Sequence, residues 1–238
     1  MGAAIYAEEV VRTFMQDPAQ FVRARTRHEC PLCGSIDFFL TVHGRREARC
    51  PSCAALERHR ILALQLNTLG FDPANQTLLH FSAERPFFSQ WKSLPGYVAG
   101  DIKKNKQANE FVDITNILYP DEHFDWIICN HVLEHVVDDM AGIRECYRVL
   151  KKSGIGFISV PLSGEEKTFE PPEDMPKSEV ERICGWDHKR YYGYDFTDKL
   201  SAVGFSVQKV NYTEEQAARY KLSTGGIDVV YMCTKPEL

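Results

Sequence analysis

The sequence contains no apolar run that approaches the roughly 20 residues needed by a bilayer-spanning helix. Its first residues, MGAAIYAEEVVR, include early acids and lack both the basic segment and the apolar core of a signal peptide. The chain begins with Met-Gly, but Tyr6 stands where a myristoylation motif has Ser or Thr. We therefore predict a cytoplasmic protein that has no membrane partner.

A large excess of positive charge is also missing, because the formal net charge is -5. The charge is uneven: residues 21–64 contain eight Arg and four Asp or Glu, so this segment is basic and the remainder is acidic. A basic segment in an acidic chain makes nucleic acid a second candidate partner, behind a small molecule. The stripe of interleaved basic and aromatic residues that suits single-stranded nucleic acid is absent. We expect Arg58, His59 and Arg60 to form a solvated, partly packed helix face or to contact an anionic substrate.

Eight cysteines are present, and four of them form two Cys-Pro-x-Cys turns with 16 residues between the turns. In a cytoplasmic chain this paired spacing predicts a metal site rather than disulfides. Four thiolates on two tight turns joined by a hairpin suit tetrahedral zinc, and a site closed in this way is structural. We expect the other four cysteines to be buried thiols. The predicted zinc ligands are Cys30, Cys33, Cys50 and Cys53.

Short apolar segments alternate with helical segments through most of the chain. This alternation predicts an α/β fold: a doubly wound, Rossmann-like, seven-stranded sheet whose end holds an antiparallel strand. We expect three parts: a helical segment at 1–27, a zinc ribbon with its connecting helix at 28–70, and the main domain at 71–238. Strands are expected near residues 38–42 of the ribbon and, in the main domain, near 77–81, 96–100, 111–114, 124–129, 155–160, 205–210 and 229–233. Helices are expected near 4–25, 56–70, 87–91, 140–150, 178–185, 195–203 and 214–220.

Residues 124–137, FDWIICNHVLEHVV, indicate where the functional site lies. The apolar run suits a central strand that is buried on both faces of the sheet. Asn130 and His131 follow at its C-terminal end, which is the edge where ligands bind in open α/β sheets. Asp101 closes the second strand, 21 residues after His80. An acid at that place can bind both hydroxyls of a ribose.

Several motifs together resemble the class I S-adenosylmethionine-dependent methyltransferases. They are Asp101, Val112-Asp113-Ile114, the PDEHFD of 120–125, the HVLEHV of 131–136 and the RExxRVLKxxG of 144–154. The ribbon before LERHR, the LHFSAE of 79–84 and the later DHxRxYG of 187–193 resemble a bacterial subgroup with an N-terminal four-cysteine zinc ribbon. The resemblance implies a methyltransferase domain at 71–238 that uses S-adenosylmethionine.

The resemblance also implies which residues contact this cofactor. Asp101 would hold the ribose, Ile102 and Ile114 would sandwich the adenine, and Asp113 would lie near its amino group. A turn cap is the alternative for Asp113, and plain core packing is the alternative for the two isoleucines. The implied contacts at the methionine end and the floor of the pocket are Phe81, Ser82, Ala83, Glu84, Asn130 and His131.

The chain departs from the family in the loop after the first strand. The family usually has an acidic residue and a glycine-rich loop there, whereas residues 80–86 read HFSAERP and contain no glycine. Glycine lets the backbone approach a ligand closely. Ser82 and Ala83 are small, and Glu84 could receive the cofactor's ammonium group. Either the altered loop binds the same cofactor, or the site does not bind it.

Methyl transfer to an alcohol or phenol benefits from a base that titrates near neutrality, which points to histidine. His188 is the first candidate, with the adjacent Asp187 to orient it, and His135 and His131 follow; a structural role is the alternative for each histidine. His131, Glu134 and His135 could share one face, which would also permit a divalent metal site.

We therefore predict a methyltransferase that acts on an O or N atom of a small molecule: a sugar, a peptide-derived metabolite or another natural product. The second hypothesis is an RNA methyltransferase whose ribbon binds nucleic acid. The third is a non-catalytic interaction protein on a degenerate methyltransferase fold, and it rests on the glycine-free loop.

Overall fold

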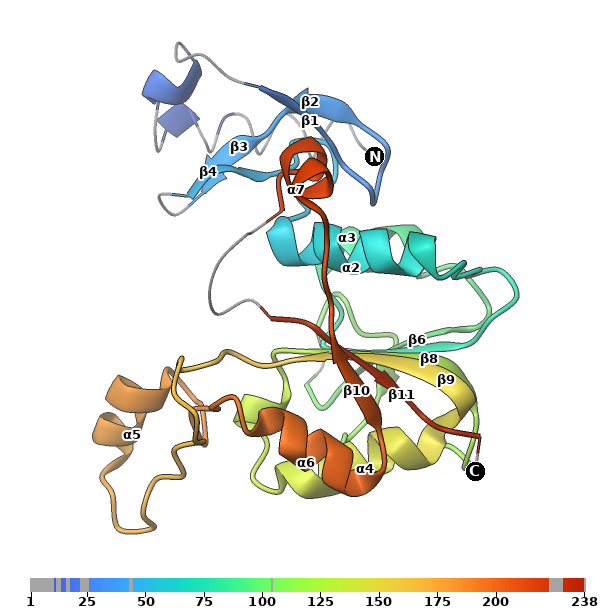
Figure 1. Cartoon of the computed structure of the whole chain (residues 1–238), viewed down its shortest axis with the longest axis vertical. Coiled ribbons are helices and arrows are strands. Elements are labelled where there is room, and N and C mark those ends of the chain that lie inside the picture. The colour runs from blue at the N-terminus through green and yellow to red at the C-terminus, as the bar shows by residue number, and fades with distance from the viewer. Residues whose placement is uncertain are drawn as a thin grey trace. The chain divides into compact units, whose positions relative to one another are not determined.

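The computed structural model describes residues 11, 14, 15, 18–21, 26–42, 45–103, 105–222 and 229–237 (Figure 1). These residues divide into two compact units. The smaller unit contains the described residues up to Phe71 together with 85–89 and 211–222, and the larger unit contains the others. The predicted boundary at residue 71 stays a prediction. Among the described residues, no helix is long and apolar enough to cross a membrane.

A seven-stranded sheet organises the larger unit, in the order β10-β11-β9-β8-β5-β6-β7 (Figure 1). The strands β5 to β9 pair in parallel, and β11 pairs antiparallel with both β9 and β10. This arrangement confirms the predicted Rossmann-like sheet with an antiparallel strand near its end. The strands are β5 Leu78–Phe81, β6 Tyr97–Asp101, β7 Glu110–Phe111, β8 Phe124–Asn130, β9 Leu150–Ser159, β10 Ser206–Lys209 and β11 Tyr231–Thr234.

One predicted strand of the sheet is much shorter than expected. The apolar pattern at 111–114 predicts a strand through Ile114, but β7 ends at Phe111. Asp113 instead forms an isolated bridge with Asn116, because its carboxylate closes a turn on Thr115. A local turn cap therefore overrides the strand preference of the apolar residues on either side.

The central strands are apolar because both of their faces are covered. All four residues of β5 are buried, as are Ile127, Ile128 and Cys129 of β8. The helix α4 begins at the N-cap Asp138, whose side chain accepts a hydrogen bond from the Ala141 N–H. The helices and the short 3-10 segment of this unit are η2 Leu133–His135, α4 Asp139–Val149, α5 Lys177–Cys184 and α6 Phe196–Val203.

The smaller unit contains two short hairpins and helical segments. The pattern at 38–42 predicts one strand, but this is wrong: Phe39 separates two strands, each with its own antiparallel partner. Gly44, predicted as the turn, and most of the predicted helix at 4–25 lie outside the described residues. The elements are η1 Pro18–Phe21, β1 Arg27–Glu29, β2 Ile36–Phe38, β3 Leu40–Val42, β4 Arg45–Arg49, α2 Glu57–Thr68 and α7 Glu214–Tyr220, while α3 Arg85–Trp91 begins in this unit and ends in the larger one.

Arg60 is the largest fully buried side chain of the protein's described part. Its guanidinium donates hydrogen bonds to the carbonyl oxygens of four residues, at 2.5 to 2.8 Å: Ala48, Ala55, Tyr220 and Lys221. Burial lowers the pKa of Arg60. The expectation of a solvated face at 58–60 is therefore wrong for Arg60, and it is also wrong for the buried His59, whose Nδ1 accepts a hydrogen bond from the Leu56 N–H.

Candidate functional site

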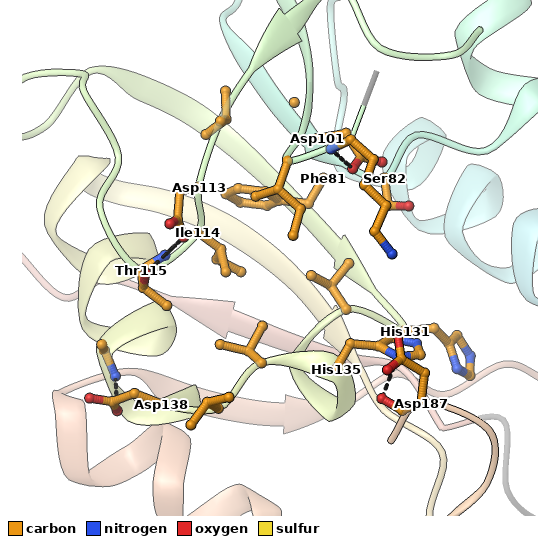
Figure 2. A pocket seen from close by; sticks show the side chains of 18 of the residues that line it. Phe81, Ser82, Asp101, Asp113, Ile114, Thr115, His131, His135, Asp138 and Asp187 are labelled. Atoms are coloured by element: carbon orange, nitrogen blue, oxygen red, sulfur yellow. Dashed lines mark hydrogen bonds and ion pairs between the residues drawn. The ribbon is translucent and has the colours of Figure 1, made fainter. Parts of the chain in front are cut away.

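A cavity of about 830 Å³ lies at the C-terminal ends of β5, β6 and β8 (Figure 2). This is the edge of the sheet at which the sequence places the site. Residues after β7, the start of α4 and the segment before Arg190 complete its wall. Nine of the predicted site residues line it: Phe81, Ser82, Asp101, Ile102, Asp113, Ile114, His131, His135 and Asp187. The others, Ala83, Glu84, Asn130 and His188, lie outside this wall.

The backbone turns sharply where β5 and β8 end at the cavity. Ser82 has a φ of 46° and His131 a φ of 54°, both in the left-handed region that glycine usually occupies. The Ser82 N–H donates to the Gly100 oxygen at 2.9 Å, and the His131 N–H donates to the Ser159 oxygen at 2.9 Å. The loop without glycine thus makes a glycine-type turn through a serine, and it keeps a small side chain at the cavity wall.

Two carboxylates are fixed on the side of the cavity formed by β6 and β7. Asp101 accepts hydrogen bonds from the Lys103 N–H at 2.8 Å and from the Asn105 side chain at 2.6 Å. Asp113 accepts from both the backbone and the hydroxyl of Thr115, so it does cap a turn while facing the cavity (Figure 2). Side chains held in this way are pre-organised for a ligand.

The two isoleucines predicted to sandwich an adenine differ in exposure. Ile114 belongs to the main hydrophobic core of the larger unit, which agrees with the alternative of plain core packing. It also lines the cavity. Ile102 is more than half exposed and lies at the rim. The apolar contact at Ile114 is therefore buried in the core, and the one at Ile102 is open to solvent.

A chain of hydrogen bonds crosses four neighbouring strands beside the cavity. His80 is fully buried on β5; its Nδ1 lies 3.0 Å from the Tyr97 hydroxyl and its Nε2 lies 2.7 Å from Glu84 Oε2. The other oxygen of Glu84 accepts from Asn130 at 3.4 Å, and Asn130 accepts from Ser159 at 2.9 Å. The predicted site residues Glu84 and Asn130 therefore belong to a polar network behind the wall. Burial raises the pKa of Tyr97, and the nearby carboxylate of Glu84 adds to the rise.

Sequence reasoning missed His80, Tyr97 and Ser159 as members of this network. The available signal was a histidine inside an otherwise apolar strand, because a buried imidazole needs partners for both ring nitrogens. The partners themselves come from strands that only the folded sheet brings together.

Two predicted catalytic residues, His135 and Asp187, lie on the opposite side of the cavity from Asp101 (Figure 2), and the third, His188, contacts His135. The rings of His135 and His188 meet edge to face with their centroids 4.8 Å apart. The Asp187 carboxylate is 4.0 Å from His135 Nδ1, whereas His188 Nδ1 lies 2.6 Å from the carbonyl oxygen of Cys184. Asp187 lines two cavities: the large one, which His135 also lines, and a second of about 280 Å³ beside α5, which His188 also lines.

The four cysteines predicted to bind zinc form a cluster in the smaller unit. Their sulfur atoms all lie within 4.8 Å of one another, and two of the pairs, Cys30–Cys53 and Cys33–Cys50, are separated by 3.7 and 3.8 Å. Each turn has the same backbone: Gly34 and Ala54 donate back to the first cysteine's carbonyl oxygen and take a left-handed conformation. Tetrahedral zinc holds thiolates about 2.3 Å away, so this set of donors fits it with little movement. The four residues are Cys30, Cys33, Cys50 and Cys53.

Comparison with known proteins finds similarity to methyltransferases. Residues 96–158 match the family described as methyltransferase domain. A probable S-adenosylmethionine-dependent methyltransferase of Mycolicibacterium smegmatis is 26% identical over 96 residues, which is 40% of this chain and 34% of that protein. One of Mycobacterium tuberculosis is 36% identical over 70 residues, 29% of this chain and 23% of that protein. The chain thus spans about a third or less of the length of these curated relatives.

Solved structures share the fold of the larger unit. An S-adenosylmethionine-dependent methyltransferase from Mesorhizobium loti matches with a TM-score of 0.52 and 14% identity, covering 74% of this chain and 98% of the other. At this identity the likeness concerns the fold alone. The strand order, the cavity at the strand ends and the matched residues agree: residues 96–158 are similar to the methyltransferase domain family, and the chain has the fold of a solved S-adenosylmethionine-dependent methyltransferase.

Proposed function

We propose that this protein transfers the methyl group of S-adenosylmethionine to an oxygen or nitrogen atom of a small molecule. The observation that carries the proposal is the cavity at the strand ends, with the fixed carboxylate of Asp101 in its wall. A volume of about 830 Å³ has room for a nucleoside cofactor and part of an acceptor.

The residues on the β6 and β7 side fit the nucleoside half of the cofactor. Both oxygens of Asp101 already accept hydrogen bonds, and each keeps a further lone pair for a ribose hydroxyl. Ile102 and Ile114 offer apolar contact to the adenine, and Ser82 allows close approach at the methionine end. The sulfonium of the bound cofactor supplies an activated methyl group, so the protein has to bind, orient and exclude water.

The acceptor side is formed by aromatic, apolar and titratable residues at the rim. Trp186 and Val137 are largely exposed and line the cavity with His135 and Asp187. An apolar surface beside imidazole and carboxylate groups suits an acceptor with an apolar body and an ionisable hydroxyl or amine. The Nδ1 of His135 lies 3.1 Å from the Asp187 carbonyl oxygen, so an N–H there leaves its Nε2 as the atom that can receive the acceptor's proton.

For the four-cysteine cluster we propose structural zinc. The cluster would hold the ends of the two hairpins together and would leave no open position for catalysis. The nucleic-acid hypothesis receives less support, because several arginines of the basic segment are used inside the smaller unit. Arg60 is buried on carbonyl oxygens, Arg27 donates to the Ile36 carbonyl oxygen, and Arg45 pairs with Glu57.

Calorimetric titration of the zinc-replete protein with S-adenosylmethionine and with its demethylated product tests the proposal. A micromolar Kd, about -8 kcal/mol, is expected for both ligands. Asp101→Ala should weaken binding at least tenfold while the protein stays folded, and Asp174→Ala, an exposed acid in another loop, is the matched control. Absence of binding by the wild-type protein would overturn the cofactor assignment, and unchanged affinity in Asp101→Ala would overturn the ribose site.

A further inference from the structure

Glu134 carries a buried oxygen that lacks a partner. Its side chain is 1% exposed, and Oε2 has no hydrogen-bond partner among the residues that the structure describes. Oε1 lies 3.4 Å from His131 Nδ1. An unsatisfied carboxylate oxygen in the interior is costly, and buried acids normally pair with cations or coordinate metals. The proposed methyl transfer does not use the Glu134 carboxylate.

Two histidines stand beside that carboxylate. One ligand atom each of Glu134, His135 and His188 lie within 4.8 Å of one another. His188 Nδ1 is 2.6 Å from the Cys184 carbonyl oxygen, and His135 Nδ1 is 3.1 Å from that of Asp187. A carbonyl acceptor fixes the proton on Nδ1 and leaves the lone pair on Nε2. Histidines that bind metals are held in this way, by a hydrogen bond from the ring nitrogen that does not bind.

Backbone contacts tie the two segments that supply these ligands. The Lys189 N–H donates to the carbonyl oxygen of Glu134 at 2.7 Å. The Arg190 guanidinium donates to the carbonyl oxygens of Val136 and Val137 at 2.6 and 2.8 Å. Glu134 and His135 are adjacent on η2, so His188 is the only ligand that must be brought from another segment. These contacts hold it there before any ion binds.

We propose that Glu134, His135 and His188 form a binding site for one divalent transition-metal cation, separate from the four-cysteine cluster. Bonds of about 2.1 Å keep two ligand atoms within about 4 Å of each other, so the observed separations close with side-chain shifts of about 1 Å or less. Two imidazoles and one carboxylate suit Zn²⁺, Co²⁺, Fe²⁺ and Mn²⁺, and they leave positions open. Thiolates, in contrast, favour Zn²⁺ strongly over Mn²⁺.

The cation would define the acceptor class of the proposed reaction, and this part rests on the proposed function. Because His135 lines the large cavity, the open positions lie at its acceptor side. A cation there stabilises the ionised form of a hydroxyl, which points to an alcohol or phenol and to O-methylation. The hydroxyl proton leaves to water, the oxygen lone pair forms the O–CH3 bond, and the S–CH3 electron pair stays on sulfur. With the cation bound, His135 Nε2 is a ligand, so water replaces it as the group that receives the hydroxyl proton.

Binding of Mn²⁺ to the full chain tests the site, after the cysteine cluster has been loaded with zinc and excess zinc removed. The paramagnetic resonance signal of free Mn²⁺ reports binding, and one ion per chain is expected. His188→Gln and Glu134→Gln should each weaken binding at least tenfold. His123→Gln, which changes a histidine outside the cluster, is the matched control and should bind as the wild type does.

His188 is partly exposed, so His188→Gln keeps the test decisive if the buried Glu134→Gln variant fails to fold. Wild-type protein that takes up no Mn²⁺, or a folded His188→Gln variant that binds it unchanged, overturns the site. Titration with S-adenosylmethionine measures cofactor binding separately from Mn²⁺ binding. Cofactor binding without Mn²⁺ binding overturns only the metal site, whereas Mn²⁺ binding without cofactor binding overturns only the proposed function.

Discussion

Replacing His80 by phenylalanine should destabilise the protein strongly, although the ring size is nearly kept. The substitution removes the contacts from the imidazole to Glu84 at 2.7 Å and to the Tyr97 hydroxyl at 3.0 Å. A hydrogen bond to a charged group contributes about 1.5–3 kcal/mol, and one between neutral groups contributes about 0.5–1.5 kcal/mol. Together they predict a loss of about 2–4 kcal/mol in the free energy of unfolding.

Urea unfolding of zinc-replete protein, followed by tryptophan fluorescence, measures this loss. Tyr97→Phe removes only the neutral contact and should cost about 1 kcal/mol. Glu84→Gln keeps the side-chain shape but removes the charge. Because His80 and Glu84 touch, the double variant should lose less than the sum of the single losses, with a coupling of about 0.5–3 kcal/mol.

Two results would refute this reasoning. One is a loss below about 0.5 kcal/mol in His80→Phe, the range of a neutral surface substitution. The other is simple additivity of His80→Phe and Glu84→Gln, which would mean that the two groups do not act as a pair. Either result would also remove the physical basis for regarding Glu84 as fixed behind the cavity wall.

The remaining predictions concern the backbone and the pH dependence of stability. Ser82→Gly should keep or raise the free energy of unfolding, by up to about 1 kcal/mol, because the left-handed conformation is strained for serine and not for glycine. A lower free energy of unfolding in urea would contradict this strain. Burial raises the pKa of Asp139, but hydrogen bonds from Lys199 and Tyr192 outweigh it, so the pKa of Asp139 is lowered in the folded protein. Its contribution to stability should be complete above the unfolded-state value of about 3.9 and should fade as the pH drops through the lower folded value. Unfolding of the wild type and of Asp139→Asn from about pH 7 to pH 3 should show the stability difference shrinking with acid, and a constant difference would contradict it.

Much of the fold follows from local patterns in the sequence. The apolar run of β8, the acid at the end of β6 and the paired cysteines each depend on neighbours a few residues away, so the sheet, the strand-end cavity and the cysteine cluster were predictable. The buried role of Arg60 was not, because two of its acceptors, Tyr220 and Lys221, are about 160 residues away in the chain. The same holds for His80, whose surroundings are assembled only when the strands pair.

The smaller unit is assembled from separate segments of the sequence, which affects how the chain folds during synthesis and how it can be divided into fragments. The unit is discontinuous in sequence, since 85–89 and 211–222 complete it. During synthesis the carbonyl oxygens of Tyr220 and Lys221 that receive the Arg60 guanidinium emerge about 160 residues after Arg60 itself. A fragment that stops at Phe71 retains two of the four acceptors, Ala48 and Ala55, around a buried cation. The N-terminal segment and residues 211–222 therefore complete one unit, and a fragment without 211–222 lacks two of the four acceptors of the buried Arg60 guanidinium.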